Sequence, residues 1–165
     1  MRPLSSLQVV PSLNKNTGGP AFSVSGLAAA LSRARVTTTV VSLDYFEHGA
    51  QVGAPGARCL SVQPSALGRR LRGWSPRMSR LIEKAASDAD IIHSHALWMF
   101  PGIYARRAAA RLDRPLVISP RGMLDPWSLE RSRVSKRLAA RLYENRNLRL
   151  AYLLHATSDL EAESI

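Results

Sequence analysis

Short apolar runs alternate with helix-like segments along this chain, and that alternation constrains its fold more than any other feature. The runs are rich in valine, isoleucine and leucine, and most lack the apolar–polar alternation of a strand with one wet face. Such strands are typical of a parallel sheet covered by helices on both faces. The sequence therefore predicts an α/β, Rossmann-like, doubly wound fold with a mainly parallel sheet. The predicted strands span residues 7–10, 36–43, 58–62, 90–94, 115–119 and 151–156.

The segments between these runs carry helical periodicity. Predicted helices span residues 22–31, 76–86 and 101–112. The longest helical candidate, residues 129–150, has an apolar row at i, i+4 and i+8 beside a cationic row. Ser158 and Glu161 then have the spacing of a capping box that starts a last helix. The two rows are Val134, Leu138 and Leu142, and Arg133, Arg137 and Arg141.

Length and composition favour one soluble globular domain. The 165 residues can bury a full hydrophobic core. No stretch approaches the roughly 18 apolar residues of a membrane span, and the N-terminus lacks the apolar region of a signal peptide. Cys59 is the only cysteine, which excludes an internal disulfide and a cysteine-based zinc site and suits a reducing cytoplasm.

The chain is strongly basic. Its 23 basic and 12 acidic residues leave a net charge of +11, which favours phosphate-bearing ligands, acidic lipid surfaces or nucleic acid as partners. Two basic patches stand out, and the first has Leu71 and Trp74 among its arginines. Each patch is either a simple solvated face or a surface that contacts an anionic membrane. The patches are Arg69, Arg70, Arg72, Arg77 and Arg80, and Arg131, Arg133, Lys136, Arg137 and Arg141.

A Thr-Gly-Gly-Pro loop at residues 17–20 joins the first strand to the first helix. Gly18 and Gly19 either supply a turn with positive φ or let the backbone approach an anion at the helix N-terminus. The dinucleotide-binding G-x-G-x-x-G pattern and the phosphate-binding P-loop are both absent.

Two histidines and a tryptophan follow the apolar run at residues 90–92. Ligands of open α/β sheets bind beyond the carboxyl ends of the strands, so these side chains are candidates for one wall of a site. We expect His93 and His95, two residues apart, to face opposite sides of the strand and not to share a metal ion. His95 is the better ligand candidate, either bonding a sugar hydroxyl or lying buried against backbone. Trp98 either stacks on a sugar or anchors its loop.

A second candidate wall follows the run at residues 115–119. Arg121 stands where that strand ends, and its guanidinium can hold a phosphate or a carboxylate. The alternative is a salt bridge from Arg121 to Asp125 in an ordered turn. The sequence contains no G-x-S-x-G elbow and no paired carboxylate motif, so no self-sufficient catalytic apparatus is evident.

Taken in order, these motifs resemble glycosyltransferase family 4. The segments at residues 17–20, 90–98, 119–127 and 155–163 look like the N-terminal, acceptor-side domain of its GT-B fold. The resemblance implies retaining transfer of a sugar from a nucleotide-sugar co-substrate, with no other cofactor and no bound metal. It also implies that the C-terminal, donor-binding domain with its Glu-x7-Glu signature is absent, so that residues 1–165 form one domain, incomplete at its C-terminal end.

The resemblance also gives roles to individual residues. Gly18 and Gly19 would face the donor phosphates, and His95, Trp98, Arg121 and Asp125 would line the substrate cleft. Arg121 stands where many family members have a histidine near the donor sugar, so the usual role of that position stays open.

The expected function is that of half a glycosyltransferase. It would act on a glycan or lipid-linked acceptor in cell-envelope or exopolysaccharide assembly, and it would be inactive alone because catalysis needs both substrates fixed in a closed cleft. The expected location is the cytoplasm, peripheral at the inner membrane face. The alternative is a non-enzymatic basic module that binds nucleic acid or an anionic surface.

Overall fold

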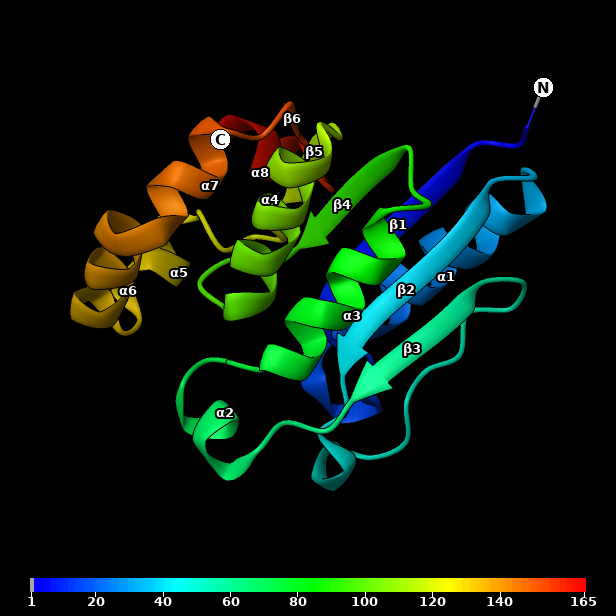
Figure 1. Ribbon diagram of the computed structural model, residues 1–165. Coiled ribbons are helices and arrows are strands. Elements are labelled where there is room, and N and C mark those ends of the chain that lie inside the picture. The colour runs from blue at the N-terminus through cyan, green and yellow to red at the C-terminus, as the bar shows by residue number, and fades with distance from the viewer. Residues whose placement is uncertain (1) are drawn as a thin grey trace.

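The computed structural model describes residues 2–165 and contains a six-stranded, fully parallel sheet. The strand order β3-β2-β1-β4-β5-β6 starts at the centre and runs outward in both directions, as in a doubly wound sheet. The predicted fold class is confirmed (Figure 1). The strands are β1 (Ser5–Ser12), β2 (Thr37–Leu43), β3 (Arg58–Val62), β4 (Ile91–His95), β5 (Leu116–Ser119) and β6 (Leu153–Leu154).

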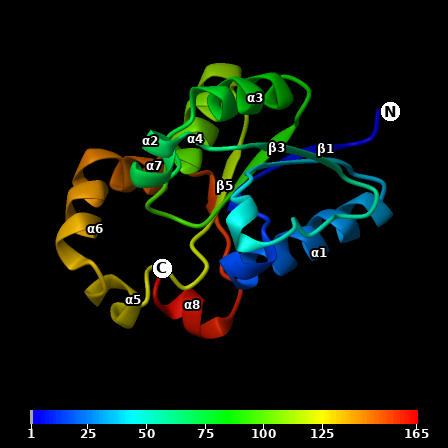
Figure 2. The ribbon, with the colours of Figure 1, turned by 90° about the horizontal axis from the view of Figure 1, so that it is seen from below.

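Helices cover both faces of this sheet. Helices α3 (Pro76–Ala86) and α4 (Phe100–Leu112) pack together on one face, and α1 (Gly19–Arg33) packs on the other (Figure 2). Proline stands in the first turn of all three, where its missing N–H is not needed. The shorter elements are the 3-10 helices η1 (Lys15–Thr17) and η2 (Phe46–His48) and helices α2 (Ala66–Arg70) and α8 (Asp159–Glu163).

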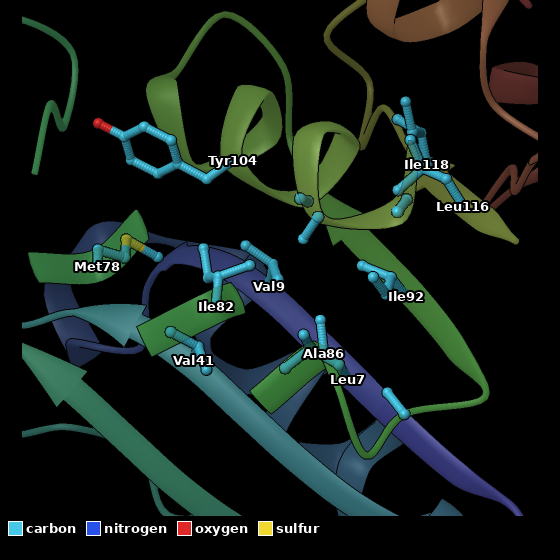
Figure 3. Close-up of a cluster of buried hydrophobic side chains, with 14 of the residues drawn as sticks. Leu7, Val9, Val41, Met78, Ile82, Ala86, Ile92, Tyr104, Leu116 and Ile118 are labelled. Carbon is cyan, nitrogen blue, oxygen red and sulfur yellow. The ribbon is translucent and has the colours of Figure 1, made fainter. Parts of the chain in front are cut away.

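The main apolar core lies between the sheet and the α3–α4 face. Leu7 and Val9 of β1 and Ile92 of β4 pack there against Met78 and Ile82 of α3, and all five are fully buried (Figure 3). The alternate side chains of β1 and β4 point to the α1 face, since successive strand residues face opposite sides. Near the carboxyl ends of β4 and β5 that second face is polar, and it is there that the candidate site forms.

The predicted long helix at residues 129–150 is wrong. The segment breaks into α5 (Pro126–Glu130), α6 (Arg133–Ala139), a π-helical turn η3 (Ala140–Glu144) and α7 (Asn145–Arg149). Ser132 adopts a left-handed conformation with φ of 57°, which ends any continuous helix between α5 and α6. The π turn brings Glu144 into the domain interior, where it is 2% exposed.

The last predicted strand, residues 151–156, is reduced to two paired residues. Leu153 and Leu154 pair with Val117 and Ile118 of β5 at the edge of the sheet. No helix within residues 2–165 has the length and apolar character needed to cross a membrane.

Candidate functional site

The carboxyl ends of β1, β4 and β5 meet the first turn of α1. Gly18 caps that helix with φ of 105°, a conformation that side chains rarely adopt, so the positive-φ interpretation holds for Gly18. Gly19 begins the helix, and a Cβ added there would meet nothing within 4 Å. The helix therefore starts beside open space at the carboxyl edge of the sheet, where both glycines are exposed.

Arg121 joins this helix to strand β4. Its Nη1 donates a hydrogen bond to Ser23 Oγ at 2.8 Å, and its Nη2 donates to His95 Nδ1 at 3.1 Å. Ser23 Oγ in turn donates to the carbonyl of Gly19 at 3.1 Å. The structure thus brings Gly19, His95 and Arg121 into one cluster. The alternative salt bridge from Arg121 to Asp125 is wrong, because no ion pair within residues 2–165 involves Arg121.

His95 is a buried, neutral acceptor. Its Nε2 lies 2.8 Å from Gln8 Oε1, and the Gln8 amide nitrogen donates to Ser6 Oγ. With Gln8 Oε1 as an acceptor, His95 must carry its proton on Nε2, which leaves Nδ1 free to accept from Arg121. Burial, reinforced by His93 and Arg121, holds the pKa of His95 well below its ordinary value.

His93 lies on the same side of β4 as His95, contrary to the expectation of opposite sides. Their ring centroids are 4.0 Å apart, because side chains two residues apart on a strand share one face and only neighbours alternate. His93 Nε2 lies 2.8 Å from Ser119 Oγ, which also lies 2.9 Å from His155 Nδ1. Burial, then the nearby His155 and Arg121, lowers the pKa of His93 to about 3.

The two imidazoles belong to a polar layer beneath the site. Their partners are the amide of Gln8 in β1, the hydroxyl of Ser119 in β5 and the guanidinium of Arg121 in the loop after β5. Within the described residues, no three His, Cys, Asp or Glu side chains lie together in a way that could hold a metal ion.

Trp98 anchors the β4–α4 loop. Its φ is 64°, its N–H donates to Glu144 Oε2 at 2.7 Å, and its carbonyl accepts from Arg72 Nη1 and Tyr143 Oη at 3.0 and 2.8 Å. The Trp98 side chain is 7% exposed and lines a hollow against α5 and α6, not the pocket beside Ala96. The anchor interpretation therefore accounts for Trp98.

Sequence reasoning missed the role of two glutamates. Glu144 holds the Trp98 amide, and Glu161 Oε1 accepts from the Gly122 N–H at 2.7 Å while Oε2 accepts from the N–H and hydroxyl of Thr157. Each carboxylate thus fixes a loop whose residues have positive φ, Trp98 in one and Arg121 and Gly122 in the other. The capping-box spacing did mark Glu161, and Ser158 Oγ accepts from its N–H as predicted, but its side chain bonds Thr157 instead of Ser158.

These glutamates titrate in opposite directions. Burial raises the pKa of Glu144, partly offset by the hydrogen bonds from Trp98 and Asn147. Burial also acts to raise the pKa of Glu161, but the bonds from Thr157 and the Gly122 amide outweigh it and hold that pKa below its ordinary value.

Asp125 belongs to the Arg121 turn without binding Arg121. It precedes α5 at the cap position, and its Oδ2 would lie 3.3 Å from a Cβ added at Gly122. Its Oδ1 and the Nε of Arg121 are both buried without a hydrogen-bond partner.

A pocket of about 210 Å³ opens beside this cluster at the carboxyl edge of the sheet. Thr17 and Pro20 form its side near α1, Ala96 and Met99 come from the β4–α4 loop, and Met123 follows Arg121. A larger hollow of about 530 Å³ lies at the amino ends of the strands. We assign the site to the smaller one, because ligands of parallel sheets bind at the carboxyl edge.

The same architecture is found in several solved structures. The Anabaena protein Alr3699/HepE, crystallised with UDP and glucose, covers 96% of this chain at a TM-score of 0.55 and 18% identity. UDP-GlcNAc 2-epimerase from Methanocaldococcus jannaschii covers 98% at a TM-score of 0.58 and 10% identity, and Acinetobacter baumannii MurG covers 93% at 0.52 and 11%. At these identities the likeness shows the fold alone, that of one half of a GT-B enzyme. The chain spans about 40% of the length of these proteins.

A family model gives the sequence-level assignment. The glycosyl transferase 4-like domain matches residues 18–165, which contain every candidate site residue from Gly18 to Asp125. No curated protein sequence matches the chain significantly. The match does not favour the alternative of a nucleic-acid-binding module, and it agrees with the resemblance drawn from the motifs. The chain therefore belongs to the glycosyl transferase 4-like domain family, and its fold matches one half of a GT-B structure.

Proposed function

We propose that this chain is the acceptor-side half of a retaining glycosyltransferase that uses a nucleotide-sugar donor. The observation that carries the proposal is the state of Arg121. Its guanidinium is held by two neutral acceptors, Ser23 Oγ and His95 Nδ1, and by no carboxylate within the described residues. The Glu161 carboxylate lies close enough to favour the charged form of Arg121 without a hydrogen bond to it, so the guanidinium can still bind a ligand anion.

The surroundings of Arg121 favour a phosphate ligand. The N-terminus of α1 carries the positive end of a 15-residue helix, and Gly19 leaves its approach open. Arginine binds phosphate oxygens in a bidentate manner. A donor diphosphate lying between Gly19 and Arg121 would have its sugar near the pocket lined by Ala96 and Met123.

Transfer would need a second domain. The structurally similar proteins are more than twice as long as this chain. We propose that a donor-binding domain closes over the carboxyl edge of the sheet in the complete enzyme. The isolated chain would then bind a donor weakly and turn it over negligibly, because the donor is not fixed against an acceptor. The acceptor would be a glycan or a lipid-linked sugar in cell-envelope or exopolysaccharide assembly at the cytoplasmic face of the membrane.

The test is nucleotide binding by the purified chain. NMR titrations with UDP-glucose, UDP and uridine monitor this binding through the amide chemical shifts. We expect shifts at Gly18, Gly19 and Gly122 with the diphosphates and much smaller ones with uridine. Arg121→Gln should abolish them, whereas Arg131→Gln, which removes the same charge from α5–α6, should leave them intact. Equal shifts with uridine, or undiminished shifts in Arg121→Gln, would contradict the proposal.

A further inference from the structure

Helix α6 and the turn η3 present their large aliphatic side chains to water. Val134, Leu138 and Leu142 are 83%, 59% and 69% exposed. The residues that the same segment buries are the small Ala139 and the charged Glu144. A surface helix ordinarily packs its apolar row against the domain, whereas here the apolar row faces solvent. An exposed apolar row of this kind indicates an interaction surface.

Cations surround this apolar row. Arg131, Arg133 and Arg137 are exposed, and no ion pair within residues 2–165 includes any of them. Two copies of such a surface would repel each other, since each brings the same sign of charge. The complementary partner is an anionic surface that also accepts aliphatic groups.

A hollow of about 340 Å³ lies beside α6 and is lined by two of these cations, Arg133 and Arg137. Arg133 and Arg137 of α6 form part of its wall, with Leu129 and Glu130 of α5 and the side chain of Trp98. Lys136 also lines it, but its amine donates to Ser128. The arginines are therefore the cations free to bind a ligand there.

Trp98, which also lines the hollow, carries an unsatisfied polar group. Its indole Nε1 is buried and has no hydrogen-bond partner within the described residues. An unsatisfied buried N–H is unfavourable by about 1–3 kcal/mol, so native structures rarely leave one without an acceptor. A phosphate oxygen entering the hollow would accept charge-assisted hydrogen bonds from the guanidinium groups of Arg133 and Arg137.

We propose that α5, α6 and η3 form a binding surface for anionic phospholipid. The phosphate of a lipid headgroup occupies the hollow beside Trp98, and the row of Val134, Leu138 and Leu142 lies in the interface between headgroups and acyl chains. In Figure 1 this helical segment stands at one side of the domain, away from β2 and β3. The surface does not depend on sugar transfer, so its test and that of the proposed function can fail separately.

Vesicle sedimentation of the whole chain tests this surface. At low salt we expect binding to phosphatidylcholine vesicles that contain phosphatidylglycerol, and little binding to pure phosphatidylcholine. The double variant Arg133→Gln, Arg137→Gln should bind about thirtyfold more weakly, since each cation at an anionic surface contributes about fivefold. The variant Val134→Ser, Leu138→Ser should also lose binding, and it should fold normally because both side chains are exposed.

A matched control removes two arginines elsewhere. Arg33→Gln, Arg58→Gln has the same net charge as the hollow variant, but its changes lie at the end of α1 and the start of β3. It should weaken binding less than about threefold, because salt screens charges far from the bound surface. An equal loss in the control would mean diffuse attraction and would overturn the proposal.

Three further results would overturn it. One is binding of the Val134→Ser, Leu138→Ser variant as tight as that of the unchanged chain. Another is a shift of the Trp98 indole resonance with inorganic phosphate in NMR spectra, without any binding of the chain to vesicles, which would mark a free-phosphate site. The third is a dimer in sedimentation velocity that disappears in the same serine variant, since the row would then be covered by a second copy.

Discussion

His95 Nδ1 accepts a hydrogen bond from Arg121 Nη2 across 3.1 Å, although both side chains are bases. The bond exists only while His95 is neutral. The Gln8 side-chain oxygen accepts a hydrogen bond from the Nε2–H of His95 and so fixes the tautomer whose Nδ1 is free to accept. The position of the cation in the candidate site therefore depends on a buried histidine that does not itself face the ligand.

This dependence predicts that the fold loses stability at mildly acid pH. The folded-state pKa of His93 is about 3, and that of His95 lies well below 6.5, so in this range protons bind the unfolded chain and not the native one. The free energy of unfolding should be highest above pH 6.5. At pH 5 it should be lower by about 2 kcal/mol for each of the two histidines.

Urea denaturation at pH 7.5, 6 and 5 measures this loss. The variant His93→Gln should show about half the pH dependence of the unchanged chain over that range. A free energy of unfolding that stays constant from pH 7.5 to 5 would show that the two imidazoles titrate normally in the native state.

The order of elements was predictable because it depends on local patterns. Uniform apolar runs such as residues 115–119 identify buried parallel strands, and the proline-led segment at residues 76–86 is an ordinary helix, so the doubly wound sheet follows. The break near Ser132 was not predictable from periodicity, because residues on both sides favour a helix. The π turn is accompanied by a tertiary contact, from Glu144 to the amide of Trp98, which lies 46 positions away.

The site was predictable only as a set of strand ends. That Gly19, His95 and Arg121 would meet follows from parallel strands sharing one carboxyl edge. Their actual partners, Ser23 and Gln8, come from elements whose side-chain directions the sequence does not reveal. The error over His93 came from applying the alternation of neighbours to residues two apart, and the strand geometry itself would have corrected it.

The Arg121 turn should depend on Glu161. Replacement by glutamine keeps an acceptor for Gly122 but places an amide N–H where Oε2 now accepts from Thr157. Glu161→Gln should therefore reduce the free energy of unfolding by about 1–3 kcal/mol. It should also speed hydrogen exchange at the Gly122 amide.

The neighbouring Glu163 is the matched control, since it is exposed on the same short helix. Glu163→Gln should change stability by less than about 0.5 kcal/mol. Equal effects of the two substitutions, measured by urea denaturation, would mean that the Glu161 bonds do not support the turn.

The glycine pair should respond unequally to substitution. Gly18 has φ of 105° and ψ of −169°, a region open almost only to glycine, so Gly18→Ala should cost about 1–3 kcal/mol of stability. Gly19 begins a helix with nothing within 4 Å of an added Cβ, so Gly19→Ala should be neutral or slightly stabilising. Thermal or urea denaturation of both variants decides this, and a Gly19→Ala loss as large as that of Gly18→Ala would contradict the stated geometry.

Glu144 should tolerate loss of its charge but not loss of its oxygen. Burial raises its folded-state pKa, so above the ordinary carboxyl range the ionised group lowers stability relative to a neutral acceptor of the same shape. Glu144→Gln keeps an oxygen for the Trp98 amide and removes the buried charge, but its amide replaces the oxygen that accepts from Asn147, so it should change stability at pH 7.5 by less than about 1 kcal/mol. Glu144→Ala leaves the Trp98 amide unsatisfied in a loop with φ of 64°. We expect the alanine variant to lose about 3 kcal/mol in urea denaturation and to shift the fluorescence of Trp98. A glutamine variant as unstable as the alanine variant would show that the Trp98 loop needs the negative charge itself.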